Sequence, residues 1–179
     1  MNHKAVFLLC VLLCFGSSAI AQSIPFCGQT LTDKTIELEC AEATVTDLSP
    51  LKGLPNLKDL SLMYVKATDF SPLKELKSLK KLNLVAVETS DFSFLKEMKT
   101  LEELTLGSVN INDLSPLADL QNLKVLYLGR TKVTDLTPLQ GLKNLRKLEH
   151  EGNYDLPEDT IKELKKALPK LKVKYVGGD

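Results

Sequence analysis

The sequence predicts an α/β fold, a right-handed, curved solenoid with a parallel β-sheet on its concave side and short 3₁₀ or α-helical turns on its convex side. A segment that starts DLSPLKGLPNLKDLSL returns four more times, each start 22 residues after the last. Its opening aspartates are Asp47, Asp69, Asp91, Asp113 and Asp135. Leucine-rich columns keep the same register through all five units. A constant period of this length is typical of a solenoid, because each unit buries its apolar face against its neighbours.

The strand of each unit is predicted from the pattern L-x-x-L-x-L. In the first unit this pattern is Leu57, Leu60 and Leu62, and the alternation places Leu60 and Leu62 on one face. The segment Thr35–Cys40 resembles a partial first strand, because Leu38 and Cys40 lie 22 residues before the same two positions. We therefore expect about seven short strands once the end of the chain is included.

The turn after each strand contains S-P-L or a close variant. Serine and threonine are good N-cap residues, and proline is favoured at the first helical position. The expected caps are Ser49, Ser71, Ser115 and Thr137. Few residues remain before the next strand, so each turn has room for one 3₁₀ or α-helical turn only.

Residues 1–21 have the pattern of a cleavable secretory signal peptide. A short cationic start at Lys4 precedes the apolar segment 5–15, and Ala19-Ile20-Ala21 supplies the small-x-small cleavage pattern. An uncleaved membrane anchor is the alternative, but the apolar segment is short for a span. We expect a secreted or periplasmic protein with no stable membrane insertion after the signal is removed.

Residues 22–46 are expected to form an N-terminal cap with the first strand and one disulfide. Cys27 and Cys40 are the cysteines left after signal removal, and two cysteines in an exported chain most simply pair. The short loop that they close is worth roughly 3 kcal/mol in the chain-entropy model. The alternative is a reactive thiol pair, although no CxxC spacing or neighbouring histidine supports it.

Residues 157–179 are expected to form a C-terminal cap of one helix and one strand. The segment Pro157–Leu168 is amphipathic, with Ile161, Leu164 and Leu168 on one side. Pro169 ends this helix, and the segment 171–175 then alternates as a strand. Together they would cover the open end of the stack.

These columns resemble the leucine-rich-repeat family, and most closely its bacterial, internalin-like class with 22-residue units. The resemblance covers about residues 35–150, and we place the full 22-residue repeats at 47–156. It implies the solenoid fold. One column departs from the family, which usually has asparagine three residues after the strand. This chain has Val65, Val87, Val109 and Thr131 there, with Asn153 in the last unit.

Little in the sequence supports catalysis, and we predict a protein that is not an enzyme and needs no cofactor or metal. His150 occupies an inward strand position, so we expect a packed imidazole instead of a ligand or base. The 23 basic and 23 acidic residues balance, which gives no overall attraction to nucleic acid. The aspartate column is a possible cation or hydrolytic site, although short acidic side chains at turns commonly bond the turn backbone.

The remaining candidate is the outward face of the sheet. We expect a protein-binding surface made of two clusters, Met63, Tyr64 and Val85 on one half and Val125, Tyr127 and Arg130 on the other. Gly107 and Gly129 would leave room between the clusters for a partner side chain. The predicted function is therefore an exported, monomeric module that binds a protein or peptide on its concave sheet. The alternative is a structural, self-associating envelope protein.

Overall fold

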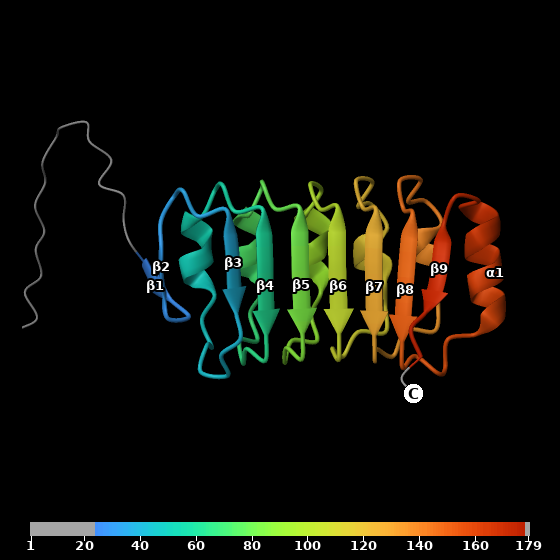
Figure 1. Cartoon of the computed structure of the whole chain (residues 1–179), viewed down its shortest axis with the longest axis horizontal. Helices are drawn as coiled ribbons and strands as arrows, with labels where there is room; N and C mark the ends of the chain where they lie inside the picture. The colour runs from blue at the N-terminus through green and yellow to red at the C-terminus, as the bar shows by residue number, and fades with distance from the viewer. Residues whose placement is uncertain (1–23, 178–179) are drawn as a thin grey trace, which may run out of the picture.

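A computed structural model describes residues 24–177, so the predicted signal peptide at 1–21 lies outside the described residues. The main feature is a parallel sheet of seven strands that lie side by side in chain order, β3 to β9 (Figure 1). The repeat strands are β3 (Glu37–Cys40), β4 (Asp59–Met63), β5 (Lys81–Val85), β6 (Glu103–Gly107), β7 (Val125–Gly129) and β8 (Lys147–Glu151). This arrangement confirms the predicted solenoid.

The strands pair in the register that the repeat predicts. Leu60 of β4 lies opposite Leu82 of β5, and Leu82 lies opposite Leu104 of β6. The same 22-residue step continues through Leu126 and Leu148. These leucines are buried, because one face of the sheet packs against the turns on the far side of each coil. The repeated leucine columns therefore form one continuous core along the solenoid.

Short 3₁₀ helices cover the back of the sheet, as expected. They are η1 (Ser49–Gly53), η2 (Ser71–Glu75), η3 (Ser93–Glu97), η4 (Ser115–Leu117) and η5 (Thr137–Leu139). The expected serine and threonine caps are wrong in detail. In η1 the N-cap is Leu48, Ser49 is the first helical residue, and no side chain caps the helix. The Ser49 hydroxyl donates instead to the carboxylate of Asp47, two residues earlier, which also accepts the Ser49 backbone N–H.

Side-chain hydrogen bonds join neighbouring coils at the turn before the strand. The amide groups of Asn56, Asn122 and Asn144 donate to carbonyl oxygens of the preceding coil at 2.7–2.8 Å. The hydroxyl of Thr100 makes the equivalent bond to the Leu79 carbonyl at 2.8 Å. The column after the strand is apolar and buried at Val65, Val87 and Val109. Inter-coil side-chain bonds in most repeats are therefore placed before the strand.

The N-terminal end of the solenoid is covered by an antiparallel hairpin that the sequence did not predict. It consists of β1 (Ile24–Phe26) and β2 (Gln29–Leu31). Phe26 and Leu31 are buried against the first coil. A disulfide joins Cys27, in the hairpin turn, to Cys40 at the end of β3. The hairpin and β3 are thus covalently fixed to each other.

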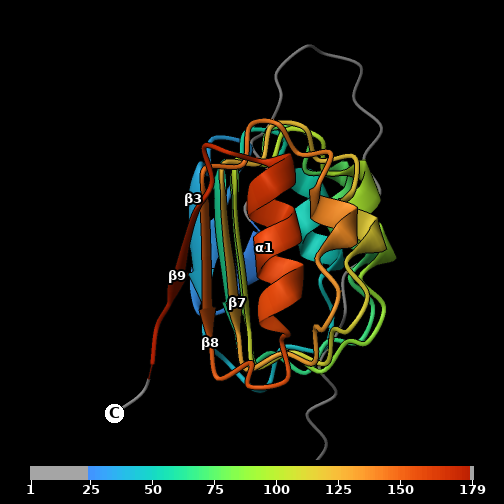
Figure 2. The same cartoon turned by 90° about the vertical axis from the view of Figure 1, so that its right-hand side faces the viewer.

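The C-terminal end is covered by α1 (Glu158–Ala167), which is followed by β9 (Lys172–Tyr175). Figure 2 looks onto this end and shows α1 between the sheet and the 3₁₀ layer. Leu164 and Leu168 are buried, and Ile161 packs partly against the same core. The amphipathic helix and the final strand therefore lie as the sequence predicts. No helix within residues 24–177 is long and apolar enough to cross a membrane.

Candidate binding surface on the sheet

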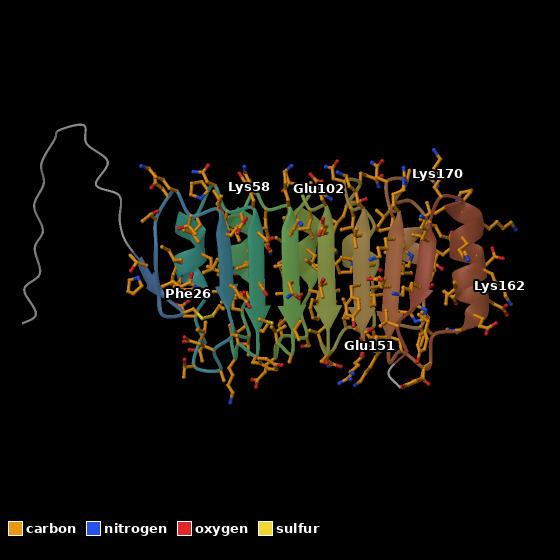
Figure 3. The ribbon with its side chains drawn as sticks, in the orientation of Figure 1. Phe26, Lys58, Glu102, Glu151, Lys162 and Lys170 are labelled. Atoms are coloured by element: carbon orange, nitrogen blue, oxygen red, sulfur yellow. A yellow bond between two sulfur atoms is a disulfide. The ribbon has the colours of Figure 1, made fainter. Side chains whose placement is uncertain are left out.

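The exposed side of strands β3 to β9, called here the open sheet face, carries outward residues in rows that cross the coils. Strand pairing sets two rows side by side. The first row is Asp59, Lys81, Glu103, Val125 and Lys147, and the second is Ser61, Asn83, Thr105, Tyr127 and Glu149. A third row lies at the carboxyl ends of the strands and consists of Met63, Val85, Gly107, Gly129 and Glu151. Figure 3 shows Glu151 at this lower edge of the sheet.

The third row contains a hollow of about 190 Å³, called here the Tyr127 hollow. Glycine at two successive positions of this row lowers the floor of the sheet, and larger side chains from neighbouring strands form the walls. The lining residues are Val85, Gly107, Ser108, Tyr127, Gly129, Arg130 and Glu151. The hollow combines an aliphatic wall, an aromatic ring and a charged pair on one surface.

Tyr127 is held in place by its own neighbours. Its ring lies over Gly129, where an added Cβ atom would be 2.6 Å from the ring carbon Cε1. The phenol donates a hydrogen bond to Oε2 of Glu151. The other oxygen of that carboxylate lies 3.6 Å from Nη2 of Arg130. The expected free space above Gly129 is therefore filled by Tyr127, and the hollow opens toward Val85 and Gly107.

The environment of Tyr127 favours its neutral form. Burial raises the pKa of Tyr127, and the hydrogen bond to the Glu151 carboxylate raises it further, to about 12. The hydroxyl group therefore remains a donor at neutral pH. Arg130 is mostly exposed, with 72% of its side chain open to solvent.

The six residues proposed from the sequence do not all lie together. Val85, Tyr127 and Arg130 line the Tyr127 hollow. Met63 lies directly opposite Val85 on the neighbouring strand, outside the hollow. Tyr64 is 59% exposed at the end of β4, and Val125 is half-buried on β7. The structure thus joins Val85 to the Tyr127 side, whereas the sequence grouped it with Met63 and Tyr64.

A feature missed at the sequence level is a column of left-handed residues immediately after the strands. Its members have φ between 50° and 63°, and they are Tyr64, Ala86, Ser108, Arg130 and Gly152. Their backbone N–H groups, from Tyr64 to Arg130, donate to the carbonyl at the end of the next strand at 2.6–2.9 Å. Non-glycine residues in this region cost about 1 kcal/mol or more each. Only Gly152 carries the usual sequence signal for this conformation.

The aspartates of the column bind the backbone of their own turns. In every repeat the aspartate Oδ1 accepts the backbone N–H two residues later at 2.8 Å. For Asp91 that backbone bond, followed by the Ser93 hydroxyl, lowers the carboxyl pKa. For Asp113 the Ser115 hydroxyl is the larger cause, followed by the backbone bond. Within residues 24–177 no group of three or more His, Cys, Asp or Glu residues has an arrangement suited to a metal ion.

His150 is packed, as its inward position predicts. It is 8% exposed, and its ring centroid lies 5.3 Å from that of Tyr175 on β9. Burial lowers the pKa of His150, which favours the neutral imidazole. The ring therefore joins the last repeat to the C-terminal strand.

Comparisons with known proteins agree with this geometry. A family model described as leucine-rich repeats in two copies matches residues 99–141. The structure of internalin C2 from Listeria monocytogenes is 30% identical, with a TM-score of 0.70, and the match covers 80% of this chain and 62% of that one. The chain is a leucine-rich-repeat protein of the internalin-like class. A leucine-rich-repeat protein from Leptospira interrogans is 26% identical, with a TM-score of 0.67, over 79% of this chain and 37% of that one.

A second Listeria monocytogenes internalin shares the fold at 23% identity and a TM-score of 0.60, over 84% of this chain and 51% of that one. This leucine-rich-repeat chain therefore spans less than two thirds of the length of each of these neighbours. No curated protein matches the sequence. The leucine-rich-repeat solenoid is a fold typical of protein-binding modules.

Proposed function

We propose that this protein is an exported, non-enzymatic module that binds a protein or peptide through its open sheet face. The observation that carries the proposal is the Tyr127 hollow, in which Val85 from one coil meets Tyr127 and Arg130 from another. Tyrosine and arginine are enriched where binding energy concentrates at protein interfaces. Because Tyr127 is fixed by Glu151 and by packing on Gly129, its ring loses little freedom when a partner binds.

The remaining proposed contacts extend this surface across the sheet. Met63 and Val85 form a half-buried pair on neighbouring strands, and Tyr64 beside them is exposed. Val125 lies on the same strand as Tyr127. A partner that covers the hollow and these flanking residues would bury apolar area on both sides of Gly107 and would interact with the Arg130 guanidinium at the rim.

The proposed location is outside the cytosol, in the periplasm or the external medium. The Cys27–Cys40 disulfide supports an oxidising compartment, because such bonds are rare in reducing cytosol. The signal-like pattern at residues 1–21 supports the same route. A monomer is the expected state of the exported module.

The test is an affinity capture with the oxidised protein from Gln22 onward, against envelope extracts and candidate host proteins. The altered protein carries Met63→Ser, Tyr64→Ser, Tyr127→Ser and Arg130→Ser. The control carries Ile36→Ser and Lys52→Ser, which change an exposed apolar and a charged residue outside the proposed surface. We expect a partner that the native and control proteins retain and the altered protein loses.

Two results would contradict the proposal. Recovery of further copies of this chain alone would favour the structural, self-associating alternative. A partner bound equally by the altered protein would place binding elsewhere on the molecule. Folding of each variant is checked by far-UV circular dichroism, so that loss of binding is not confused with loss of structure.

A further inference from the structure

Charges on the open sheet face are paired in the middle and unpaired at its two ends. Lys81 pairs with Glu103 at 3.2 Å, and Lys147 pairs with Glu149 at 3.1 Å. At the β3 end the outward residues are acidic, Glu37 and Glu39 on β3 and Asp59 on β4. At the β9 end they are Lys172 and Lys174. None of these five end residues forms an ion pair with another residue in the range 24–177.

The basic end of the face is hollowed. A groove of about 600 Å³ is lined by Arg146, Lys147, Lys170, Lys172 and Lys174. Lys170 lies at the upper edge of the sheet, opposite the Glu151 edge (Figure 3). Together the five side chains place five positive charges around one groove, and only Lys147 has a carboxylate partner among the described residues. The groove therefore favours an anionic occupant.

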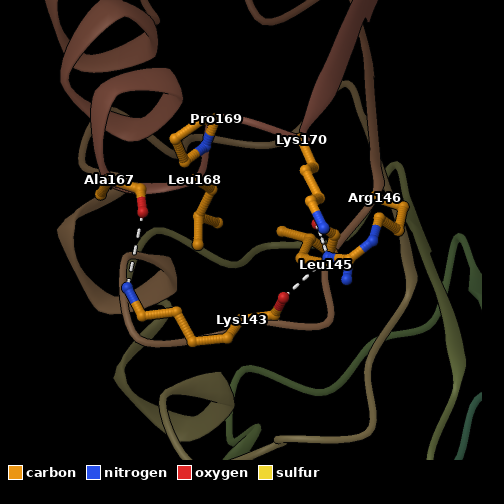
Figure 4. A pocket seen from close by; sticks show the side chains of 7 residues that line it. All are labelled: Lys143, Leu145, Arg146, Ala167, Leu168, Pro169 and Lys170. Carbon is orange, nitrogen blue, oxygen red and sulfur yellow. Dashed lines mark hydrogen bonds between the residues drawn. The ribbon is translucent and has the colours of Figure 1, made fainter.

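A second hollow of about 230 Å³ adjoins the groove at the seam with α1, and Arg146 and Lys170 border both (Figure 4). The third cationic residue that lines this second hollow is Lys143, and it already has hydrogen-bond partners. Its ammonium group donates to the carbonyl oxygens of Gln140 at 3.0 Å and Ala167 at 3.5 Å. Arg146 likewise donates through one nitrogen, Nη1, to the Lys143 carbonyl at 2.7 Å. The seam holds Arg146 in place, whereas Lys170, Lys172 and Lys174 stay free to bind.

The same end of the sheet also has a free backbone edge. In the described part of the chain, β9 is the outermost strand and has only β8 beside it. The N–H of Lys172 donates to Arg146 and that of Val176 to His150, both at 2.9 Å. Because backbone groups alternate in direction along a strand, those of Val173 and Tyr175 point away from β8. Figure 2 shows β9 at the exposed end of the sheet.

We propose that the free edge of β9 and the basic groove beside it bind an extended acidic segment of a protein partner. The segment would add a strand to the sheet, and its backbone would pair with Val173 and Tyr175. Its carboxylates would lie over Lys170, Lys172 and Lys174. The inference rests on the proposed function, because it assigns a chemical class to the protein partner.

A protein segment fits this site better than an anionic polysaccharide does. A sugar polymer can satisfy the lysine ammonium groups, but it cannot form the regular backbone ladder that a sheet edge offers. Lysine on an edge strand also opposes pairing with the same edge of a second copy, because like charges would face each other. The same charges attract an acidic strand. The acidic β3 end would repel it, which confines it to the β9 end.

The test measures binding of a fluorescent oligo-glutamate peptide to the oxidised protein at low salt. We expect Lys172→Ser with Lys174→Ser to raise Kd about tenfold, as loss of two rim charges implies. The matched control is Lys77→Ser with Lys96→Ser, which removes two exposed charges from the turn side and should leave Kd unchanged. A peptide N-methylated at alternate residues keeps its charge but cannot complete the ladder, so it should bind more weakly.

Each contrary outcome identifies a different error. Equal weakening by both double variants would mean that only net charge matters. Tighter binding of a sulfated oligosaccharide that depends on Lys172 and Lys174 would assign the groove to an anionic glycan. Unchanged binding of the N-methylated peptide would remove the strand-addition step. If the affinity capture described above finds a partner that the Lys172→Ser, Lys174→Ser protein still binds, the proposed function stands and this inference fails.

Discussion

The side chain of Tyr127 shows how single residues are fixed on the open sheet face. Its ring fills the space that Gly129 leaves, and its hydroxyl group binds Glu151. Glu151 also faces Arg130, so one carboxylate orients both of the larger side chains of the hollow. The proposed binding surface is therefore arranged before any partner arrives.

We predict that Tyr127 titrates well above its ordinary pKa of 10.0, at about 12. A group with a raised folded-state pKa contributes stability that is present below its unfolded pKa and is lost as pH rises through the folded value. Stability should therefore fall more steeply from pH 10 to 12 in the native protein than in Tyr127→Phe. Ultraviolet difference titration of the two proteins measures the pKa. A difference spectrum that titrates near pH 10 would contradict the prediction. The variant Glu151→Gln removes the carboxylate and should lower the pKa of Tyr127 toward 10.0.

Because of the aspartates in the turns, we predict that the stability of the fold decreases at acidic pH. Hydrogen bonds at the turns lower the pKa values of all five carboxyl groups. A lowered folded-state pKa contributes stability above the ordinary value of 3.8 that is lost as pH falls below it. Asp113→Asn keeps a side-chain oxygen for the turn and removes the titration. Thermal unfolding between about pH 6 and pH 2 should show a smaller decrease in Tm for Asp113→Asn than for the native protein.

The same aspartates provide a test of the cation alternative. Because one oxygen of each carboxylate already accepts a turn N–H, we expect calcium to leave the melting temperature of the native protein unchanged. Differential scanning calorimetry with and without calcium measures this. A rise in Tm that Asp91→Asn with Asp113→Asn abolishes would revive the metal-binding interpretation.

Asn153 is the one asparagine in its column, and its bonds predict a large effect of substitution. Its Oδ1 accepts the N–H of Thr131 at 2.6 Å, and its Nδ2 donates to the Leu128 carbonyl at 3.1 Å. Asn153→Val would leave the buried N–H of Thr131 without its acceptor and remove the bond to the Leu128 carbonyl, and it should lower the free energy of unfolding by about 2 kcal/mol. Asn144→Ala, which removes one exposed bond, should cost about 0.5 kcal/mol. Urea denaturation of both variants makes the comparison.

At the scale of elements, the repeat predicted most of what the structure shows. The positions of β4 to β8, their register and their buried leucines follow from one period and one alternation, because every unit supports the same assignment. The terminal helix was also predictable, since Ile161, Leu164 and Leu168 share a face and Pro169 follows them. These elements depend on local pattern and on packing between identical neighbours.

Elements that depend on position in the stack were not predictable in the same way. The left-handed conformation of Tyr64, Ala86 and Ser108 is imposed by closure of each coil, and it overrides the preference of these residue types. The hairpin of β1 and β2 has short strands without clear alternation. The sequence also could not show that Val85 would face Tyr127 across Gly107, because the hollow depends on where the Tyr127 ring turns.

The disulfide at the N-terminal end predicts a specific loss of stability. Cys27 and Cys40 are separated by 13 residues, and Cys40 is buried at the end of β3. Cys27→Ala with Cys40→Ala should lower the free energy of unfolding by about 3 kcal/mol in the chain-entropy model. Urea denaturation of the oxidised protein and the double variant measures the difference. Reductant should destabilise the native protein and leave the variant unchanged.

At the scale of the whole molecule, each coil touches only its neighbours, so stability should be distributed along the solenoid. The C-terminal coil depends on α1, where Leu164 is fully buried. Leu164→Ala should cost about 3 kcal/mol through the cavity that it leaves. Because the loss lies at one end, hydrogen exchange should accelerate in β8 and β9 before it does in β4 and β5.

The matched comparison is Leu104→Ala, which removes an equally buried leucine from β6 in the middle of the stack. This change interrupts the contacts of two coils, so it should accelerate exchange on both sides of β6. Equal acceleration along the whole chain in both variants would mean that the solenoid unfolds as one cooperative unit.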